Sequence, residues 1–176
     1  MKKGKYLFAM MVIGLAFFVA GCQSGTGERT ESSEAPAIDY SMDLGGEPWV
    51  FDIEEATLGN ESYRVANWTG KNMQLVFMTL QPGEIIDLEM HSGHDQFIRI
   101  EQGEARVQMG KAEDNLNFDK KVSDDWAILV PAGYWHKVEN IGRTDLKVYT
   151  LYGPPEHKKG TAHKTYEEAR EAHHDH

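Results

Sequence analysis

From Trp49 onward the chain consists of short apolar runs separated by turn-forming residues, a pattern typical of β-strands. Within residues 73–80 the side chains follow a two-residue period with apolar character on both faces. The predicted strands are 49–53, 63–68, 73–80, 85–90, 96–101, 105–109, 126–130, 135–139 and 146–152. Many short strands at this spacing predict an all-β sandwich or small barrel.

One helix is expected, near the C-terminus, from about Thr165 to Ala172. Thr165 is its candidate N-cap, and acidic residues in the first turn favour the positive end of the helix dipole. A cluster of histidines follows at positions 173, 174 and 176. Such a cluster binds metal adventitiously in some chains, but a solvated chain end is the simpler interpretation here.

The first 21 residues have the pattern of a secretory signal peptide, with three lysines followed by an apolar run over residues 6–20. That run is shorter than the ~20 residues of a spanning helix. It ends in Val-Ala-Gly-Cys, which resembles a bacterial lipoprotein signal with Cys22 as the acylated first residue of the mature chain. This predicts a protein anchored by lipid on the secreted side of the cell envelope. The alternative is an ordinary cleaved signal with a chance cysteine.

Composition divides the remainder of the chain. Residues 22–45, rich in Ser, Gly, Glu and Thr, are assigned to a flexible tether, residues 46–156 to the barrel, and residues 157–176 to a tail with the short helix. Removing the signal peptide takes away three lysines and no acid, so the formal charge changes from −10 to −13. This balance argues against nucleic acid, and leaves the lipid anchor as the expected contact with the membrane.

Polar side chains cluster on two predicted strands within residues 82–103. Glu89 and His91 are two positions apart and therefore point to the same side of one strand, because side chains alternate faces. Gln96 begins the next strand. A carboxylate, an imidazole and an amide so placed indicate half of a metal or polar-ligand site.

The second half lies in the segment PAGYWHKVEN at residues 131–140. Four of its residues fit the second cupin motif, P-x-G-x-x-H-x-x-x-N: Pro131, Gly133, His136 and Asn140. The glycine that begins the longer form of this motif would fall at Asp125, so that position departs from the pattern. The first cupin motif, G-x5-H-x-H-x3-4-E-x6-G, is anchored here on Gly83 and Gly103.

Between these glycines, Glu89 replaces the usual first histidine and Gln96 replaces the usual glutamate. From Phe51 to Thr165 the chain resembles single-domain cupins of the cupin 2 conserved-barrel family, in a subgroup whose first motif reads E-x-H-x4-Q. The resemblance implies a double-stranded β-helix, or jelly-roll. It also implies that a divalent metal is bound by Glu89, His91, Gln96 and His136.

Two imidazoles and one carboxylate suit Fe(II), Mn(II), Co(II), Ni(II) or Zn(II) and leave coordination positions open. The neutral amide of Gln96 is the weakest donor, and is either a ligand or a group that orients water or a bound molecule. His94 lies in the turn and is expected to be exposed. If Glu89 is not a ligand, His91 and His94 are the alternative pair that shares a metal. A further alternative is a cupin that binds no metal.

Strand parity predicts that Tyr134 points inward with His136, while Trp135 belongs to the packing face. Ile98 and Ile100 share the inward face with Gln96 and would make the pocket floor apolar. A proline-led tail, residues 151–165, carries His163 and is a candidate cap for the mouth of its own barrel or of a partner subunit. A homodimer is therefore one arrangement that we consider.

The resemblance leaves two main functions open. The first is metal-dependent chemistry, of the oxygenase or isomerase type, on a small polar molecule, with no catalytic residue assigned. The second is a non-catalytic module that binds or senses a small ligand such as a sugar or an acid. A structural cupin without metal is the third, because a fold alone does not determine function.

Overall fold

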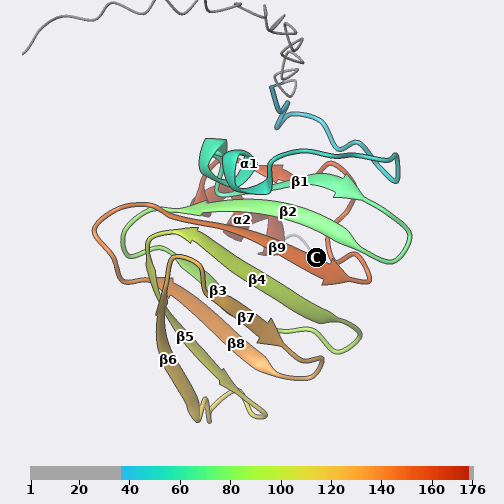
Figure 1. Ribbon diagram of the computed structural model, residues 1–176. Helices are drawn as coiled ribbons and strands as arrows, with labels where there is room; N and C mark the ends of the chain where they lie inside the picture. Colours follow the sequence, from blue (N-terminus) through green and yellow to red (C-terminus); the bar gives the residue numbers. More distant parts are fainter. Residues whose placement is uncertain (1–36, 175–176) are drawn as a thin grey trace, which may run out of the picture. The chain divides into compact units, whose positions relative to one another are not determined.

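The computed structural model describes residues 37–174 (Figure 1). Contacts divide the chain into Met1–Glu34 and Ala35–His176, and all the described residues belong to the second unit. The predicted signal peptide and Cys22 lie outside the described residues. Within residues 37–174, no helix has the length and apolar character needed to cross a bilayer.

Two antiparallel sheets form the barrel, as Figure 1 shows. The larger sheet has the order β10-β1-β2-β9-β4-β7 and the smaller has the order β3-β8-β5-β6. The strands of the larger sheet are Ala162–His163 (β10), Arg64–Thr69 (β1), Gln74–Leu80 (β2), Leu146–Gly153 (β9), Asp95–Gln102 (β4) and Ala127–Val130 (β7). Those of the smaller sheet are Ile85–Met90 (β3), Trp135–Asn140 (β8), Glu104–Gly110 (β5) and Phe118–Ser123 (β6). The predicted all-β jelly-roll is confirmed.

Inward-facing side chains of both sheets form the main core. Buried and less buried residues alternate along β8 and β9, as expected for strands with one face toward the core. Ile98 and Ile100, predicted to face inward, are fully buried in this core. Every residue of β2 is buried, which agrees with its apolar character on both faces.

The second face of β2 is covered by the segment that precedes the barrel. Here the prediction of a strand over residues 49–53 is wrong, because a helix, Ile53–Gly59 (α1), begins within it. Asp52 caps the helix by accepting a hydrogen bond from the backbone N–H of Glu55 at 3.0 Å. Trp49 and Phe51, which suggested a strand, instead stack on each other with ring centroids 3.8 Å apart.

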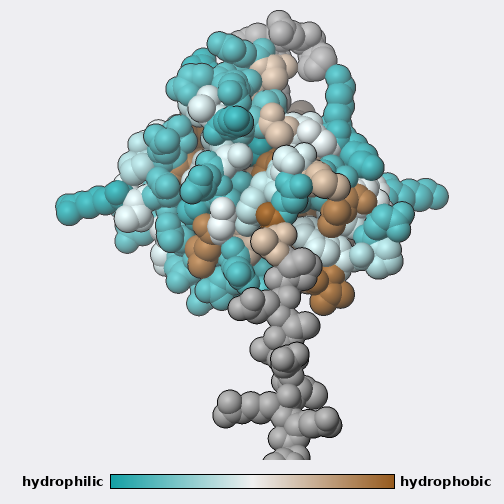
Figure 2. All heavy atoms as spheres, turned by 90° about the horizontal axis from the view of Figure 1, so that it is seen from above, coloured by the Kyte–Doolittle hydropathy of each residue, from teal (hydrophilic) through white to brown (hydrophobic). Residues whose placement is uncertain are grey.

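Residues 37–45, which the sequence assigned to the tether, are attached to the sheet. Asn67 of β1 donates through its side-chain amide to the carbonyls of Asp39 and Met42, at 3.1 and 2.9 Å. Its own carbonyl accepts from Leu44 N–H at 2.8 Å. The folded unit therefore includes chain before residue 46. Figure 2, which views the molecule from above Figure 1, shows hydrophobic residues among hydrophilic ones on this side.

The C-terminal tail returns to the larger sheet. Its helix, Tyr166–His174 (α2), is the predicted one, and the Thr165 hydroxyl accepts from Glu168 N–H at 3.2 Å as an N-cap. The two-residue strand β10 and the polar edge strand β6 were not predicted. The side-chain amide of Gln74 holds the tail by donating to the carbonyl of His157 and accepting from its N–H, both at 2.9 Å.

One departure from the cupin motif has a clear backbone reason. Asp125, at the position of the missing glycine, has a φ of 68°, which lies in the left-handed region. Aspartate is one of the few residues other than glycine that adopts this conformation readily. The turn before β7 therefore keeps the backbone shape that glycine would provide.

Candidate metal centre

Three predicted site residues converge at one end of the barrel. Glu89 of β3 lies directly opposite His136 of β8, and His91 follows at the end of β3. Glu89 Oε1 is 3.4 Å from Nε2 of His136 and 3.4 Å from Nε2 of His91. His136 is fully buried and His91 is 8 % exposed.

The atoms that face one another have no hydrogen-bond partner. Glu89 Oε1 and the Nε2 atoms of both histidines are buried, and their contacts have ion-pair distances without hydrogen-bond geometry. Gln96 Oε1 is also buried and without a hydrogen-bond partner, while its Nε2 donates to the Thr150 hydroxyl at 3.0 Å. Buried polar atoms without partners are rare. Four of them on the predicted ligand set fit the donors of a divalent metal.

The second nitrogen of His136 determines which ring nitrogen is available. Its Nδ1 lies 3.2 Å from the carbonyl oxygen of Tyr134, so an N–H at Nδ1 donates to that carbonyl and leaves Nε2 as the lone-pair donor. The Tyr134 side chain packs against the main core, as strand parity predicted. The turn before β8 thus orients the imidazole toward Glu89.

Charge at the centre favours an ionised carboxylate. Burial by itself raises the pKa of Glu89. The facing imidazoles of His136 and His91 together lower it by more than burial raises it, so the pKa lies below its usual range. For His91, burial lowers the pKa, and the carboxylates of Glu89 and Glu156 outweigh this and raise it. A carboxylate that stays ionised beside two imidazoles is a suitable anionic ligand for a divalent cation.

The expectation that His94 is exposed is wrong. Its side chain is only 9 % exposed and its ring stacks on that of His91, with centroids 4.4 Å apart. Glu156, sixty-two positions along the chain, covers it: Oε2 lies 3.1 Å from His94 Nε2, and Oε1 lies 3.7 Å from His91 Nδ1. His91, His94 and Glu156 therefore form a second donor group, and His91 belongs to both.

Arg64 and Glu156, also at this end, were not singled out from the sequence. Arg64 of β1 is 3 % exposed, and Glu156 and His157 come from the tail. His163, predicted to line the pocket, lies directly opposite Arg64 in the β1–β10 pair and borders a separate hollow with Glu156. An arginine at an inward position of an apolar strand was the one local signal for Arg64; Glu156 had none.

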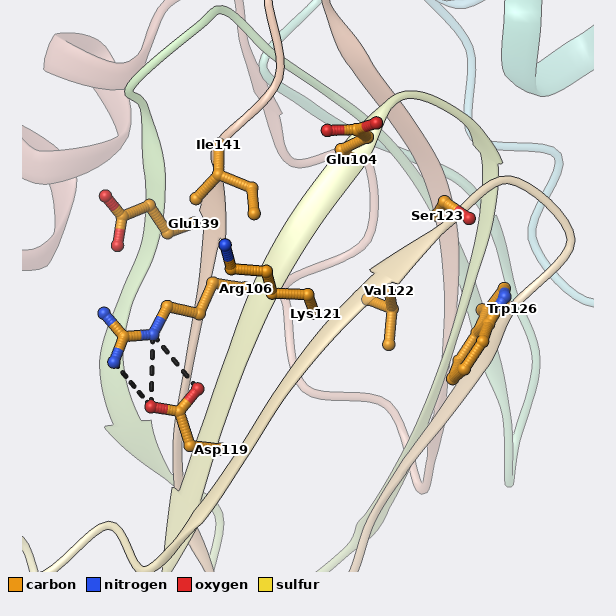
Figure 3. Close-up of a pocket in the computed structure, with 9 residues that line it drawn as sticks. All are labelled: Glu104, Arg106, Asp119, Lys121, Val122, Ser123, Trp126, Glu139 and Ile141. Atoms are coloured by element: carbon orange, nitrogen blue, oxygen red, sulfur yellow. Dashed lines mark hydrogen bonds and ion pairs between the residues drawn. The ribbon is translucent and has the colours of Figure 1, made fainter.

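A larger hollow, of about 690 Å³, lies on the outer face of the smaller sheet (Figure 3). Two of its charged residues form an ion pair, with Arg106 Nε donating to Asp119 Oδ1 at 3.0 Å. Among the described residues that line it, none contributes a buried polar atom without a hydrogen-bond partner. Volume alone therefore does not mark this surface as a site.

The fold and the centre together define a class of protein: a double-stranded β-helix with two imidazoles, a carboxylate and an amide at one end of the barrel. The chain belongs to the cupin family. The cupin domain model matches residues 76–152. YrkC of Bacillus subtilis is 52% identical over 127 residues, which cover 72% of this chain and 68% of YrkC.

Two further relatives agree. Protein L612 of Acanthamoeba polyphaga mimivirus is 41% identical over 113 residues, covering 64% of this chain and 69% of L612. The crystal structure of BH2720 from Bacillus halodurans is 48% identical and superposes with a TM-score of 0.73, covering 74% of this chain and 98% of that one. These similarities extend across the barrel that carries the centre.

Proposed function

We propose that this cupin is a metal-dependent enzyme that acts on a small polar molecule, with chemistry of the oxygenase or isomerase type. One observation carries the proposal: four buried donor atoms, from Glu89, His91, Gln96 and His136, have no hydrogen-bond partner. A buried polar atom left unsatisfied costs roughly 1–3 kcal/mol, so four at one end of a barrel are expected only where something binds them.

Two of the donors, His136 and Gln96, have a neighbour that holds their orientation. The Tyr134 carbonyl fixes the tautomer of His136, and the Thr150 hydroxyl accepts from the amide of Gln96 and leaves Oε1 available. Such supporting groups are typical of metal centres. Three strong donors and one weak one leave positions for a substrate, and a divalent ion held there supplies Lewis-acid polarisation of a substrate oxygen or the redox capacity of an oxygenase.

Residues around the centre limit access by water. Tyr152 is 1 % exposed, and its ring edge faces His91 and His94 at centroid distances of 5.7 and 5.8 Å. Glu156 covers the same histidines from the tail. A bound molecule would therefore meet the donors in a partly dry environment, where electrostatic interactions are stronger than in water.

Metal analysis of the purified domain tests the proposal. Elemental analysis of the wild type is expected to give about one divalent ion per chain, because the four donors suit the coordination of a single ion. Glu89→Gln and His136→Ala are expected to lose it, since each removes a donor. Asp119→Asn is the matched control, because it makes the same carboxylate-to-amide change on the outer face. Equal metal in wild type and His136→Ala would refute the centre.

A second measurement separates an enzyme from a binding module. The metal-loaded protein is mixed with a panel of small acids and sugars, and dioxygen consumption and isomer formation are followed. Turnover that disappears in Glu89→Gln supports the enzyme. Saturable calorimetric binding without product would instead favour the ligand-binding alternative.

We also propose that the domain is held at the cell envelope through lipid on Cys22. The lipoprotein pattern at residues 19–22 supports this. Cys22→Ser is expected to move the protein from the membrane fraction to the soluble fraction. Retention of the variant in the membrane fraction would contradict the anchor.

A further inference from the structure

A small hollow beside the candidate metal centre has an unusual charge. Its volume is about 360 Å³, and it is lined by Arg64, Glu156, His157, Lys158, Thr161 and His163. Two cations, two imidazoles and a hydroxyl thus face one carboxylate, in a chain whose formal net charge is −10. A concave surface whose charge is opposite to that of the rest of the chain attracts ligands of the opposite sign.

The hollow and the centre share a wall. Glu156 lines the hollow, and its Oε1 is 3.7 Å from His91 Nδ1. Tyr152 contacts both groups: its ring is nearly perpendicular to that of His157 at 5.2 Å and to that of His91 at 5.7 Å. A molecule of a few carbon atoms in the hollow is therefore one side chain away from the metal ligands.

The fold fixes the direction of Arg64. It lies opposite His163 on β10 and opposite Met78 on β2, so all three side chains share one face of the sheet. Met78 belongs to the main core, which shows that this face is the inner one.

Arginine suits this position chemically. Its planar guanidinium presents five N–H donors in a fork that matches carboxylate and phosphate oxygens. The one carboxylate of the hollow is already engaged, with Glu156 Oε2 3.1 Å from His94 Nε2. Its other oxygen, Oε1, lies 3.7 Å from His91 Nδ1, so each carboxylate oxygen has an imidazole beside it.

We propose that this hollow binds the anionic group of the substrate, so that the substrate is a small organic anion held by Arg64, His163 and Lys158 while its other end reaches the metal. This inference rests on the proposed function. It narrows the substrate from a small polar molecule to a carboxylate or a phosphate ester, which share the oxyanion that the hollow recognises.

Calorimetric titration of the full metal-loaded protein tests this, with succinate, inorganic phosphate and succinamide as probes. Succinamide has the size of succinate without its charge. Succinate or phosphate is expected to bind saturably, and succinamide at least about tenfold more weakly, because charge-assisted hydrogen bonds are about twice as strong as neutral ones. Preference for succinate over phosphate identifies a carboxylate substrate, and the reverse identifies a phosphate ester. Equal binding of succinate and succinamide would overturn the inference.

Variants locate the anion. Arg64→Met is expected to weaken anion binding by about tenfold or more without loss of metal, since it removes charge-assisted hydrogen bonds but no ligand. Arg106→Met, on the outer face, is the matched control and should bind as the wild type does. Lys158→Met changes an exposed residue and gives a smaller loss even if Arg64→Met does not fold. Wild-type affinity in both hollow variants would overturn the inference.

Metal content measured on the same samples distinguishes the two proposals. Wild-type protein without metal that still binds succinate through Arg64 would refute the metal-dependent function and retain the anion site. Protein with metal but no anion binding would do the opposite.

Discussion

Both faces of the smaller sheet carry ionisable side chains close to one another, but they differ in exposure and in hydrogen bonding. On the inner face, His136 is buried and the Glu89 side chain is 21 % exposed, and their facing atoms are buried and lack hydrogen-bond partners. On the outer face, Arg106 and Asp119 are exposed and satisfy each other (Figure 3). The outer face carries a hollow of about 690 Å³. The inner face differs because its donor atoms point toward one another and lack hydrogen-bond partners, which reduces the stability of the fold.

Buried donors without partners are expected to persist only where a bound ligand satisfies them. Buried polar atoms without partners destabilise a fold, whereas an exposed ion pair is hydrated on its open sides and contributes little. A ligand that binds the inner group recovers the lost interactions. Experiments that change one face at a time can test whether this contrast holds.

The largest effect is expected from removing metal. Binding to the folded state alone stabilises a protein by about 2.7 kcal/mol when free metal is 100 times its Kd. For a domain of this size, that raises the midpoint of thermal unfolding by roughly 5–10 °C, at about 2–4 °C per kcal/mol. Thermal unfolding with added Co(II) or Zn(II), and then with a chelator, measures this shift.

The outer face provides the comparison for that shift. Arg106→Ala should show the same metal-dependent rise as the wild type, and Glu89→Gln should show none. A rise of equal size in Glu89→Gln would place the stabilising metal elsewhere in the chain.

A middle-sized effect is expected from Thr150→Val, which removes the acceptor that orients the amide of Gln96. Loss of a group that supports a ligand weakens metal affinity by about tenfold or more. Competitive titration with a coloured chelator measures the change. Gln108→Leu removes an amide from the outer face, where it contacts Asp119, and is expected to leave the affinity unchanged.

The smallest effect is expected on the outer face itself. Arg106→Ala breaks a pair in which both side chains are 42 % exposed, so the midpoint of chemical unfolding should hardly change. Added salt should reduce even that difference, because ions screen exposed charges. A large loss of stability in this variant would erase the contrast between the two faces.

Much of the fold follows from local pattern. The two-residue period over residues 73–80 predicted β2, and glycine-containing turns separated most of the other strands. β6 was missed because half of the residues of Phe118–Ser123 are charged and, at this sheet edge, Val122 is the one buried residue of the strand. Local alternation cannot identify a strand that does not bury one side.

The first helix shows competing local signals. Trp49, Phe51 and Ile53 alternate as in a strand, but Asp52 with Glu55 three positions later is a capping pattern. The cap determined the structure. The lysine side chain of Lys147 donates to the Leu58 carbonyl at 2.8 Å near the end of the helix, a contact between distant parts of the chain that no local pattern contains.

The centre divides in the same way. Strand parity paired Glu89 with His91, and the resemblance to the cupin motifs added His136. The structure places ligand atoms of all three within 4.8 Å of one another. The burial of His94 depends on Glu156, which reaches it only because the tail returns to the barrel mouth. The position of Arg64 beside the centre likewise depends on its pairing with β10 and β2. Such relations depend on the tertiary fold.

Gln74, which is hydrogen-bonded to His157 of the tail, is part of a larger hydrogen-bond network. The Gln74 amide also donates to the Thr69 hydroxyl, which donates to Asp43 Oδ2, and the same oxygen accepts from Gly160 N–H at 3.0 Å. One hydrogen-bond network thus links the start of the folded unit, the adjoining ends of β1 and β2, and the tail. The beginning of the folded unit is therefore connected by hydrogen bonds to the tail segment whose Glu156 and His157 line the hollow beside the centre.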